Sequence, residues 1–462
     1  MTREAADATA TPSQPEPNAA NWHENWRVLL VFFTLAGVVE SQAFGHLGAF
    51  TPLFLQQLGV AQQQVPQWTG VLQSLGFVIG LPLLPFWGVW ADRYGRKLII
   101  VRSAYCEGII FTVAALSPNV WVLALARFLG GFVLGNTGVM LALLADRTPR
   151  RRLGLAVGIA SAGFPLGSAL GPFLGGVIAQ GPGIRTLLLF DACLSALMGV
   201  VLTVVIRERR ATTGPVAPVG QLLRVAVGDI VKSPVVVRLF ALYFAAMFGI
   251  SLVTPFIPIL LQRLYHGTLA TVPSMIGTTL TAAGIAMAVT TPLWGRAGDV
   301  IGRWVVLPIC LGAVGVGVLV EGLAPALLPL QGAIVWVGLF QGGIGATVIA
   351  LLALLSSPER RNAILNFALL PSQLSWFIGP LAGAGLAAVT FRLPYYAGAL
   401  CLALAAGLAI AVARSSHATP APHTREAPEL RDGSAATATL TDAEAAAGHA
   451  ALEAEVARLT HE

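Results

Sequence analysis

Apolar stretches of roughly 18–27 residues recur along this chain of 462 residues. A helix rises 1.5 Å per residue, so about 20 apolar residues cross the ~30 Å hydrocarbon core of a bilayer. We count twelve such stretches and expect each to form a membrane-spanning helix, which makes this an all-α membrane protein. They fall near residues 27–49, 68–89, 98–116, 119–143, 153–179, 184–206, 236–260, 272–294, 304–322, 330–355, 362–390 and 394–413.

The composition supports this class and excludes others. Apolar residues make up 56% of the chain and charged residues only 11%, whereas a soluble domain carries about a quarter charged residues. These values exclude a water-soluble globule, a nucleic-acid-binding domain and a disulfide-stapled secreted protein. The four cysteines lie in apolar stretches without C-x-x-C spacing, so we expect them to be reduced, buried and structural.

The basic residues predict how the helices are oriented, because cytoplasmic connections are rich in Lys and Arg. Alternate connections carry Arg93, Arg96 and Lys97, then Arg147, Arg150, Arg151 and Arg152, then Arg207, Arg209 and Arg210, then Arg296 and Arg303, then Arg360 and Arg361. The intervening connections hold only Arg185, Arg263 and Arg392. We therefore expect a multi-pass protein of the inner (plasma) membrane with both termini in the cytoplasm, and we interpret the net charge of +6 as an orientation signal.

Five segments follow from this pattern. Residues 1–26 are expected to be a disordered cytoplasmic tail, 27–206 a first six-helix bundle and 236–413 a second one. The basic connection 207–235 between them is expected to lie on the inner membrane surface as a linker attracted to anionic lipid. Residues 414–462 are Ala- and Thr-rich, and we expect a cytoplasmic tail with a short helix.

The two halves repeat one motif at a shift of 207 residues. Gly88, Asp92, Gly95 and Arg96 align with Gly295, Asp299, Gly302 and Arg303. Such duplication predicts two pseudo-symmetric six-helix bundles with a cavity between them near the membrane midplane. That arrangement is typical of a transporter.

The segment 88–97 resembles the hallmark loop of the major facilitator superfamily, and its second copy is weaker. The resemblance covers about residues 30–415 and implies the major facilitator fold. It also implies that the loop holds the bundles together on the cytoplasmic side of the outward-facing state; simple anchoring of the topology by positive charge is the alternative. The gating residues implied are Gly88, Asp92, Arg93, Gly95, Arg96, Lys97, Asp299 and Arg303.

A second motif resembles one of the drug:proton antiporters within this superfamily. The fifth stretch contains the pattern G-x-x-x-G-P-x-x-G-G, made by Gly167, Gly171, Pro172, Gly175 and Gly176. Small residues at four-residue spacing allow close helix packing, and the proline removes one helical hydrogen bond. The fourth stretch contains Arg127 in a sequence similar to that group's R-x-x-Q-G, with Gly130 in place of Gln. The layout resembles twelve-helix multidrug and tetracycline exporters.

Charged residues inside the membrane are costly, at about 2.5–3.5 kcal/mol or more each, and are therefore functional candidates. Five qualify: Glu40, Glu107, Arg127, Asp191 and Glu321. Counting along the expected helices places Glu40 and Arg127 at similar depths, so the two are able to pair. Our hypothesis is that Glu40 carries a proton whose binding changes when the cavity opens or a cationic substrate enters. A static salt bridge between the helices is the alternative.

The other candidates are weaker. Glu107 and Asp191 lie on stretches that the fold usually places at the periphery, so Glu107 is expected to face a neighbouring helix instead of the cavity. Glu321 lies near an outer helix end, where we expect it to reach headgroups or water. His46 is either a proton relay or a structural hydrogen-bonding residue. Asn136 and Gln341 are polar groups able to contact substrate or a neighbouring helix. The sequence has no Walker-type phosphate loop, metal-ligand cluster or nucleophile elbow, so we expect no enzyme, no cofactor and no metal.

The sequence thus predicts a monomeric secondary transporter, whose partners are a small-molecule substrate, protons and membrane lipid. The expected activity is proton-coupled efflux of hydrophobic, cationic compounds by alternating access. Proton-coupled uptake of a small metabolite is the alternative within transport. A transporter-like sensor or lipid-handling protein is the alternative outside it.

Overall fold

The computed structural model describes residues 25–207, 233–356 and 367–418, together with Gly228, Val231 and Ile364. This part of the chain is helical, without a strand. Ten helical segments in it are long and apolar enough to cross a membrane, and one of them, Leu269–Leu323, contains two successive helices. Together with the helix Leu370–Val389, which is not among the ten, they account for the twelve predicted spans. The all-α fold is confirmed.

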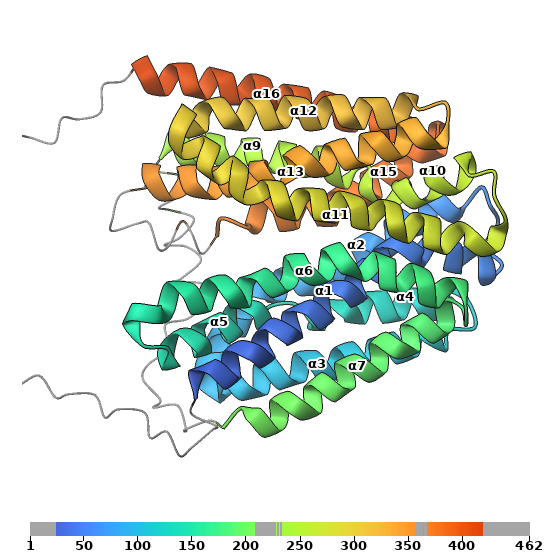
Figure 1. Ribbon diagram of the computed structural model, residues 1–462, viewed down its shortest axis with the longest axis horizontal. Helices are drawn as coiled ribbons and strands as arrows, with labels where there is room; N and C mark the ends of the chain where they lie inside the picture. The colour runs from blue at the N-terminus through green and yellow to red at the C-terminus, as the bar shows by residue number, and fades with distance from the viewer. Residues whose placement is uncertain are drawn as a thin grey trace, which may run out of the picture. The chain divides into compact units, whose positions relative to one another are not determined.

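The first half of the chain supplies the helices drawn in blue to green in Figure 1. They are α1 (Trp26–Gln57), α2 (Val65–Tyr94), α3 (Arg96–Ala115), α4 (Val120–Leu129), α5 (Asn136–Arg147), α6 (Leu153–Gln180) and α7 (Ile184–Val205). The predicted fourth span is broken into α4 and α5, because Gly135 adopts a φ of +94°. A side chain is excluded there, since a Cβ on Gly135 would lie 2.3 Å from Cδ1 of Trp87.

The second half supplies the helices drawn in yellow-green to red. They are α9 (Pro234–Ser251), α10 (Ile257–Leu264), α11 (Val272–Ala297), α12 (Arg303–Leu323), α13 (Leu327–Leu355), α15 (Leu370–Val389) and α16 (Leu393–Ala418). The amphipathic part of the predicted linker and the predicted helix of the tail lie outside the described residues. The described chain up to Val412 packs as one unit, within which the two bundles meet.

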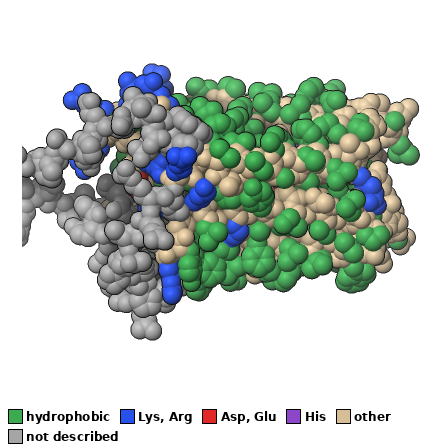
Figure 2. Space-filling model, turned by 90° about the horizontal axis from the view of Figure 1, so that it is seen from below, with side chains coloured by type: hydrophobic (Ala, Val, Ile, Leu, Met, Phe, Trp, Pro, Cys, Tyr) green, Lys and Arg blue, Asp and Glu red, His purple; other side chains and the backbone are tan. Residues whose placement is uncertain are grey.

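Basic side chains gather toward one end of the helices, as Figure 2 shows for one face, and hydrophobic side chains cover the middle. We call this the basic end. It carries Arg96 at the start of α3, Arg147 at the end of α5 and Arg303 at the start of α12. A band of apolar side chains bordered by cationic ones is the pattern expected of a protein in a bilayer.

The bundles contact each other closely in the half of the helices away from the basic end. There α6 lies against α11 so tightly that a Cβ on Gly277 would be 2.2 Å from the carbonyl oxygen of Pro172. Likewise α2 lies against α15, where a Cβ on Gly70 would be 2.3 Å from the carbonyl oxygen of Pro380. In α11, every buried residue lies between Val272 and Thr281, in the half remote from the basic end. The bundles are therefore joined at the opposite end.

Candidate functional site

Glu40 lies on the face of α1 that does not contact α6. Glycines on α6 let the two helices approach: a Cβ on Gly167 would lie 2.3 Å from the carbonyl oxygen of Val38, and one on Gly171 would lie 2.9 Å from Cα of Gln42. Since residues three or four apart share a helix face, the face with Val38 and Gln42 is occupied by α6. Glu40 is directed instead into the first bundle, between α3 and α5.

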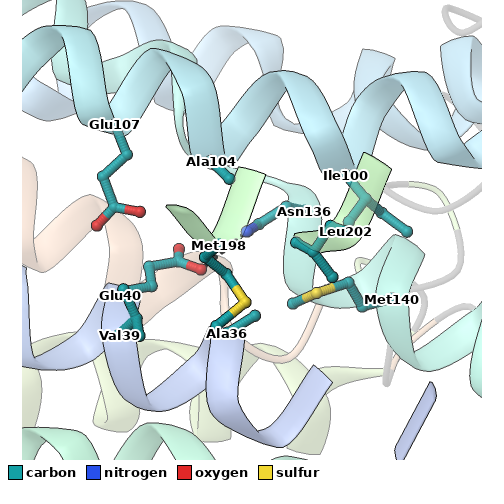
Figure 3. A pocket seen from close by; sticks show the side chains of 10 residues that line it. All are labelled: Ala36, Val39, Glu40, Ile100, Ala104, Glu107, Asn136, Met140, Met198 and Leu202. Carbon is teal, nitrogen blue, oxygen red and sulfur yellow. Dashed lines mark hydrogen bonds between the residues drawn. The ribbon is translucent and has the colours of Figure 1, made fainter. Parts of the chain in front are cut away.

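There Glu40 lines a small cavity formed by α1, α3, α5 and α7 (Figure 3). Its side chain is only 7% exposed, and its Oε2 accepts a hydrogen bond of 2.8 Å from Nδ2 of Asn136. The rest of the wall is largely apolar, and includes Ala36, Ile100, Met140, Met198 and Leu202. The space has room for about one water molecule. The two predicted residues Glu40 and Asn136 are thus brought together.

Glu107, on α3, faces the same cavity, and its carboxyl group is turned toward that of Glu40 in Figure 3. It is 4% exposed, and its Oε1 makes no hydrogen bond of ordinary geometry with the described residues. Glu107 thus faces neighbouring helices within the first bundle rather than the space between the two bundles. Ile100, Ala104 and Glu107 share one face of α3, at i, i+4, i+7 spacing, but the helix is apolar on its other faces too, so the sequence did not indicate which face is buried.

Arg127 does not pair with Glu40 as the predicted depths suggested. Its Nε donates to the carbonyl oxygen of Leu72 at 3.0 Å and its Nη2 to Oε1 of Gln73 at 2.8 Å, so its guanidinium is bound to α2. The cause lies in α1, which continues past Pro52 to Gln57 instead of ending near residue 49. At 1.5 Å per residue this places Glu40 roughly 26 Å from the C-terminal end of α1, whereas Arg127 is only about 12 Å from the N-terminal end of α4.

His46 and Asp191 form a buried ion pair that connects α1, α6 and α7. Both side chains are fully buried. Nδ1 of His46 lies 3.0 and 2.9 Å from the two carboxylate oxygens of Asp191, and Nε2 lies 2.8 Å from the carbonyl oxygen of Gly171. Gly175 makes room for the ring, since a Cβ there would lie 2.5 Å from Cδ2 of His46. This contact gives His46 and Asp191 a structural role, in joining the three helices.

The partners of His46 fix the number of protons in the pair. A carbonyl oxygen only accepts hydrogen bonds, so Nε2 carries a hydrogen that it donates to Gly171. Nδ1 faces a carboxyl group, so one further proton lies between the two side chains, on either the ring or the acid. The pair is neutral overall in both forms, and it fixes α1 to the part of α6 that contacts α11.

We expect replacement of His46 by Leu to destabilise the protein strongly, by about 3–5 kcal/mol, because Asp191 is left buried without its partner. The double replacement of His46 and Asp191 by Leu is expected to recover much of this loss, since it leaves no buried charge. Thermal unfolding in detergent of both single variants and the double variant measures this. A double variant no more stable than His46→Leu would show that the ion pair is not the cause.

The predicted gating loop is described in part. Gly95, with a φ of +103°, joins α2 to α3. Arg96 pairs with Asp146 at the end of α5, the Arg93 guanidinium lies over the ring of Tyr94, and Lys97 is partly exposed in the first turn of α3. Gly88 lies within α2, where a Cβ would meet open space, and the side chain of Asp92 lies outside the described residues. Each described ion pair of this loop is within its own bundle.

The second copy of the loop is a short π-helical turn, Gly298–Gly302, between α11 and α12. Asp299 in this turn pairs with Arg303 one turn later. Gln341, the remaining predicted cavity residue, is partly exposed on α13 in the second bundle, away from the cavity around Glu40. The structure therefore does not unite the predicted polar residues in one place.

Two six-helix bundles in an apolar band, joined at one end, define a membrane transporter. The chain belongs to the Major Facilitator Superfamily, whose model matches residues 33–276 and 239–448. Among the relatives is the multidrug resistance protein MdtG of Escherichia coli O17:K52:H18, which is 29% identical over 368 residues, or 79% of this chain and 89% of that protein. MdtG of the K12 strain shows the same identity and coverage.

Solved structures show the same fold. A bacterial homologue of the human lysosomal transporter Spinster, in an inward-facing and unoccupied conformation, has a TM-score of 0.71 at 16% identity, covering 87% of this chain and all of that one. The nucleoside transporter NupG has a TM-score of 0.68 at 12% identity, covering 84% of this chain and 99% of that one. At these identities the likeness concerns the fold alone.

Proposed function

We propose that this protein exports hydrophobic, cationic small molecules in exchange for protons, by alternating access between its two bundles. The observation that carries the proposal is the position of Glu40. It is a carboxyl group in a largely apolar cavity, hydrogen-bonded to a neutral amide, and no basic side chain lines that cavity. Burial disfavours the charged form of an acid, so a carboxyl group in this setting suits proton binding and release.

The contacts between the bundles support alternating access. By the positive-inside rule the basic end faces the cytoplasm, so the tight α6–α11 and α2–α15 contacts are on the outer side. We interpret this as an inward-facing conformation of a protein in the plasma membrane with both termini in the cytoplasm. For the other half of the cycle, the outer contacts open and the basic ends close.

The substrate class follows from the relatives and from charge. The MdtG relatives named above are multidrug resistance proteins, and a buried carboxylate that has released its proton attracts a cation. The cavity around Glu40 is far smaller than the roughly 300 Å³ or more that a drug-sized ligand needs. Substrate is therefore expected between the bundles, with Glu40 acting through proton binding. We further propose that the protein acts as a monomer in contact with membrane lipid.

A susceptibility screen tests the export function. Cells lacking their own exporters and expressing the wild-type protein are expected to tolerate higher concentrations of lipophilic cations, such as ethidium and tetraphenylphosphonium, than cells with an empty vector. Expression of Glu40→Gln is expected to give no protection. Expression of Glu321→Gln is expected to protect; it removes an acid of the other bundle that is buried instead of reaching headgroups or water as the sequence suggested. Increased sensitivity of the wild-type cells would instead support the alternative, proton-coupled uptake.

A further inference from the structure

The cavity of the first bundle holds two carboxyl groups, although the proposed function needs one. Glu40 comes from α1 and Glu107 from α3, and both line the same space (Figure 3). They are 7% and 4% exposed. Glu40 has Asn136 as its partner. Glu107 lies near the hydroxyl group of Ser195 on α7, but its Oε1 makes no hydrogen bond of ordinary geometry in the described chain. Two buried acids facing one another need an explanation.

The charges around the cavity leave this pair without a cation. On α1 and α7, His46 and Asp191 are occupied with each other, and their pair is neutral overall. On α4, Arg127 is bound to α2. On α3, the Arg102 guanidinium is stacked 3.4 Å above the ring of Trp87. No basic residue contributes to the cavity wall.

Two carboxylates cannot both remain charged at close range in an apolar site without a counter-ion. At least one proton is therefore held between Glu40 and Glu107. A metal ion is the alternative counter-ion. No group of three or more His, Cys, Asp or Glu suited to a metal occurs in the described part of the chain, which favours a proton, and the sodium titration below tests the alternative. The small volume also excludes an organic cation.

We propose that Glu40 and Glu107 form a single proton-binding centre, in which Glu107 is the second proton-binding residue. The centre holds one proton when unloaded and two when loaded, and the second proton is the one exchanged. Asn136 donates to Glu40, so it favours the charged form of that residue when the proton is released. The inference deepens the proposed function, because it names a second residue of the proton site and gives the proton count.

The consequence is that the two acids titrate as a coupled pair. When two groups interact strongly, each proton lost belongs to the pair, and replacing one group changes the titration of the other. An independent Glu107 would instead titrate identically whether or not Glu40 is present. This difference is measurable without any transported compound.

The test is an infrared pH titration of the purified full-length protein in lipid, following the carbonyl band of protonated carboxyl groups in wild type, Glu40→Gln, Glu107→Gln and the double variant. We expect wild type to titrate in two steps and each single variant to lose intensity. The carboxyl group that remains is expected to titrate in one step, on the order of one pH unit below the second step of wild type, because in wild type that step places a second negative charge beside the first. The proposal would be overturned if the losses of band intensity in the two single variants add up to the loss in the double variant and the titration midpoint of the remaining carboxyl group does not shift.

Two further variants keep the test decisive. Glu107→Asp retains a carboxyl group, and its coupling to Glu40 is expected to persist even if Glu107→Gln folds poorly. Glu321→Gln removes a buried acid of the other bundle, 1% exposed and likewise without a hydrogen-bond partner in the described chain, and is expected to leave the Glu40 signal unchanged. A change of the band on adding sodium at constant pH would indicate a metal site and contradict the proton assignment.

The infrared titration and the export screen test different proposals, so either proposal is able to be rejected without the other. If no lipophilic cation is exported but the two acids titrate as a pair, the proton centre stands and the substrate assignment is wrong. If cations are exported but the acids titrate separately, export stands and Glu107 has no part in proton binding.

Discussion

Cross-linking of cysteines introduced at Gln56 and Gln262 is expected to stop transport completely. Gln56 lies in the last turn of α1 and Gln262 in α10, so the two belong to different bundles. Each side-chain amide donates to the oxygen of the other, at 2.9 and 3.0 Å. This reciprocal pair lies at the end opposite the basic one, where the bundles are joined.

The pair also reflects the internal repeat. Pro52 and Gln56 in the first half correspond to Pro258 and Gln262 in the second at a shift of 206 residues. Equivalent positions of the two halves are therefore in contact at the interface between the two bundles. In the proposed cycle, opening of this end separates the two residues, which are in contact in the structure.

The experiment uses a background in which the four native cysteines are replaced. All four are unpaired, but only Cys310 is buried as expected, and Cys193 is exposed. A short bifunctional thiosulfonate reagent joins the two new cysteines, and reductant releases them. Transport is expected to fall to the level of vesicles without the protein and to return after reduction. As a matched control, cysteines at Ser117 and Arg185 are joined within the first bundle at the same end, where Nη2 of Arg185 donates to the carbonyl oxygen of Ser117 at 2.9 Å. Full activity of the cross-linked Gln56–Gln262 pair would contradict a cycle that opens the outer side.

Replacement of Glu40 by Gln is expected to abolish proton-driven export while leaving the fold intact. Gln keeps the size of the side chain and is able to accept the hydrogen bond from Asn136, but it does not exchange a proton. In everted vesicles, wild-type export of ethidium is expected to increase as the lumen is made more acidic, because the proton is bound on that side and released on the other. The variant is expected to show export at background level at every pH.

Two control variants distinguish the loss of proton binding from a change in side-chain packing. Glu40→Asp retains an acid and is expected to keep a pH response, and Glu321→Gln removes a buried acid elsewhere and is expected to keep the wild-type one. Thermal unfolding of Glu40→Gln close to that of wild type is expected, since the cavity loses a costly buried acid. Proton-driven ethidium export that persists in Glu40→Gln would exclude Glu40 as the essential carrier.

Much of the fold was predictable because the bilayer restricts it. A chain in lipid must satisfy its backbone hydrogen bonds internally, so long apolar stretches specify helices, and the repeat of Asp92 at Asp299 indicates two similar halves. The ends of the helices were less predictable. Pro52 did not terminate α1, and the resulting error in depth produced the false pairing of Glu40 with Arg127.

The sequence predicted which residues belong to the candidate site, but not which of them contact each other. Intramembrane charge identified Glu40, Glu107 and Asp191 from the sequence alone. Which of these side chains contact each other depends on the rotation of each helix about its axis. Helices that are apolar on all faces show little hydrophobic periodicity, so this rotation is difficult to infer from the sequence. The contact of His46 with Asp191 joins residues 145 positions apart, and only the packing of α1 against α7 reveals it.

The most direct test of the account is simultaneous measurement of proton and ethidium movement in proteoliposomes that contain only this protein. Under an imposed pH gradient we expect ethidium to move against its own concentration gradient and opposite to protons, and to stop when an ionophore collapses the pH gradient. Glu40→Gln is expected to show neither movement. Movement of ethidium in the same direction as protons, or movement unaffected by the pH gradient, would contradict proton-coupled export.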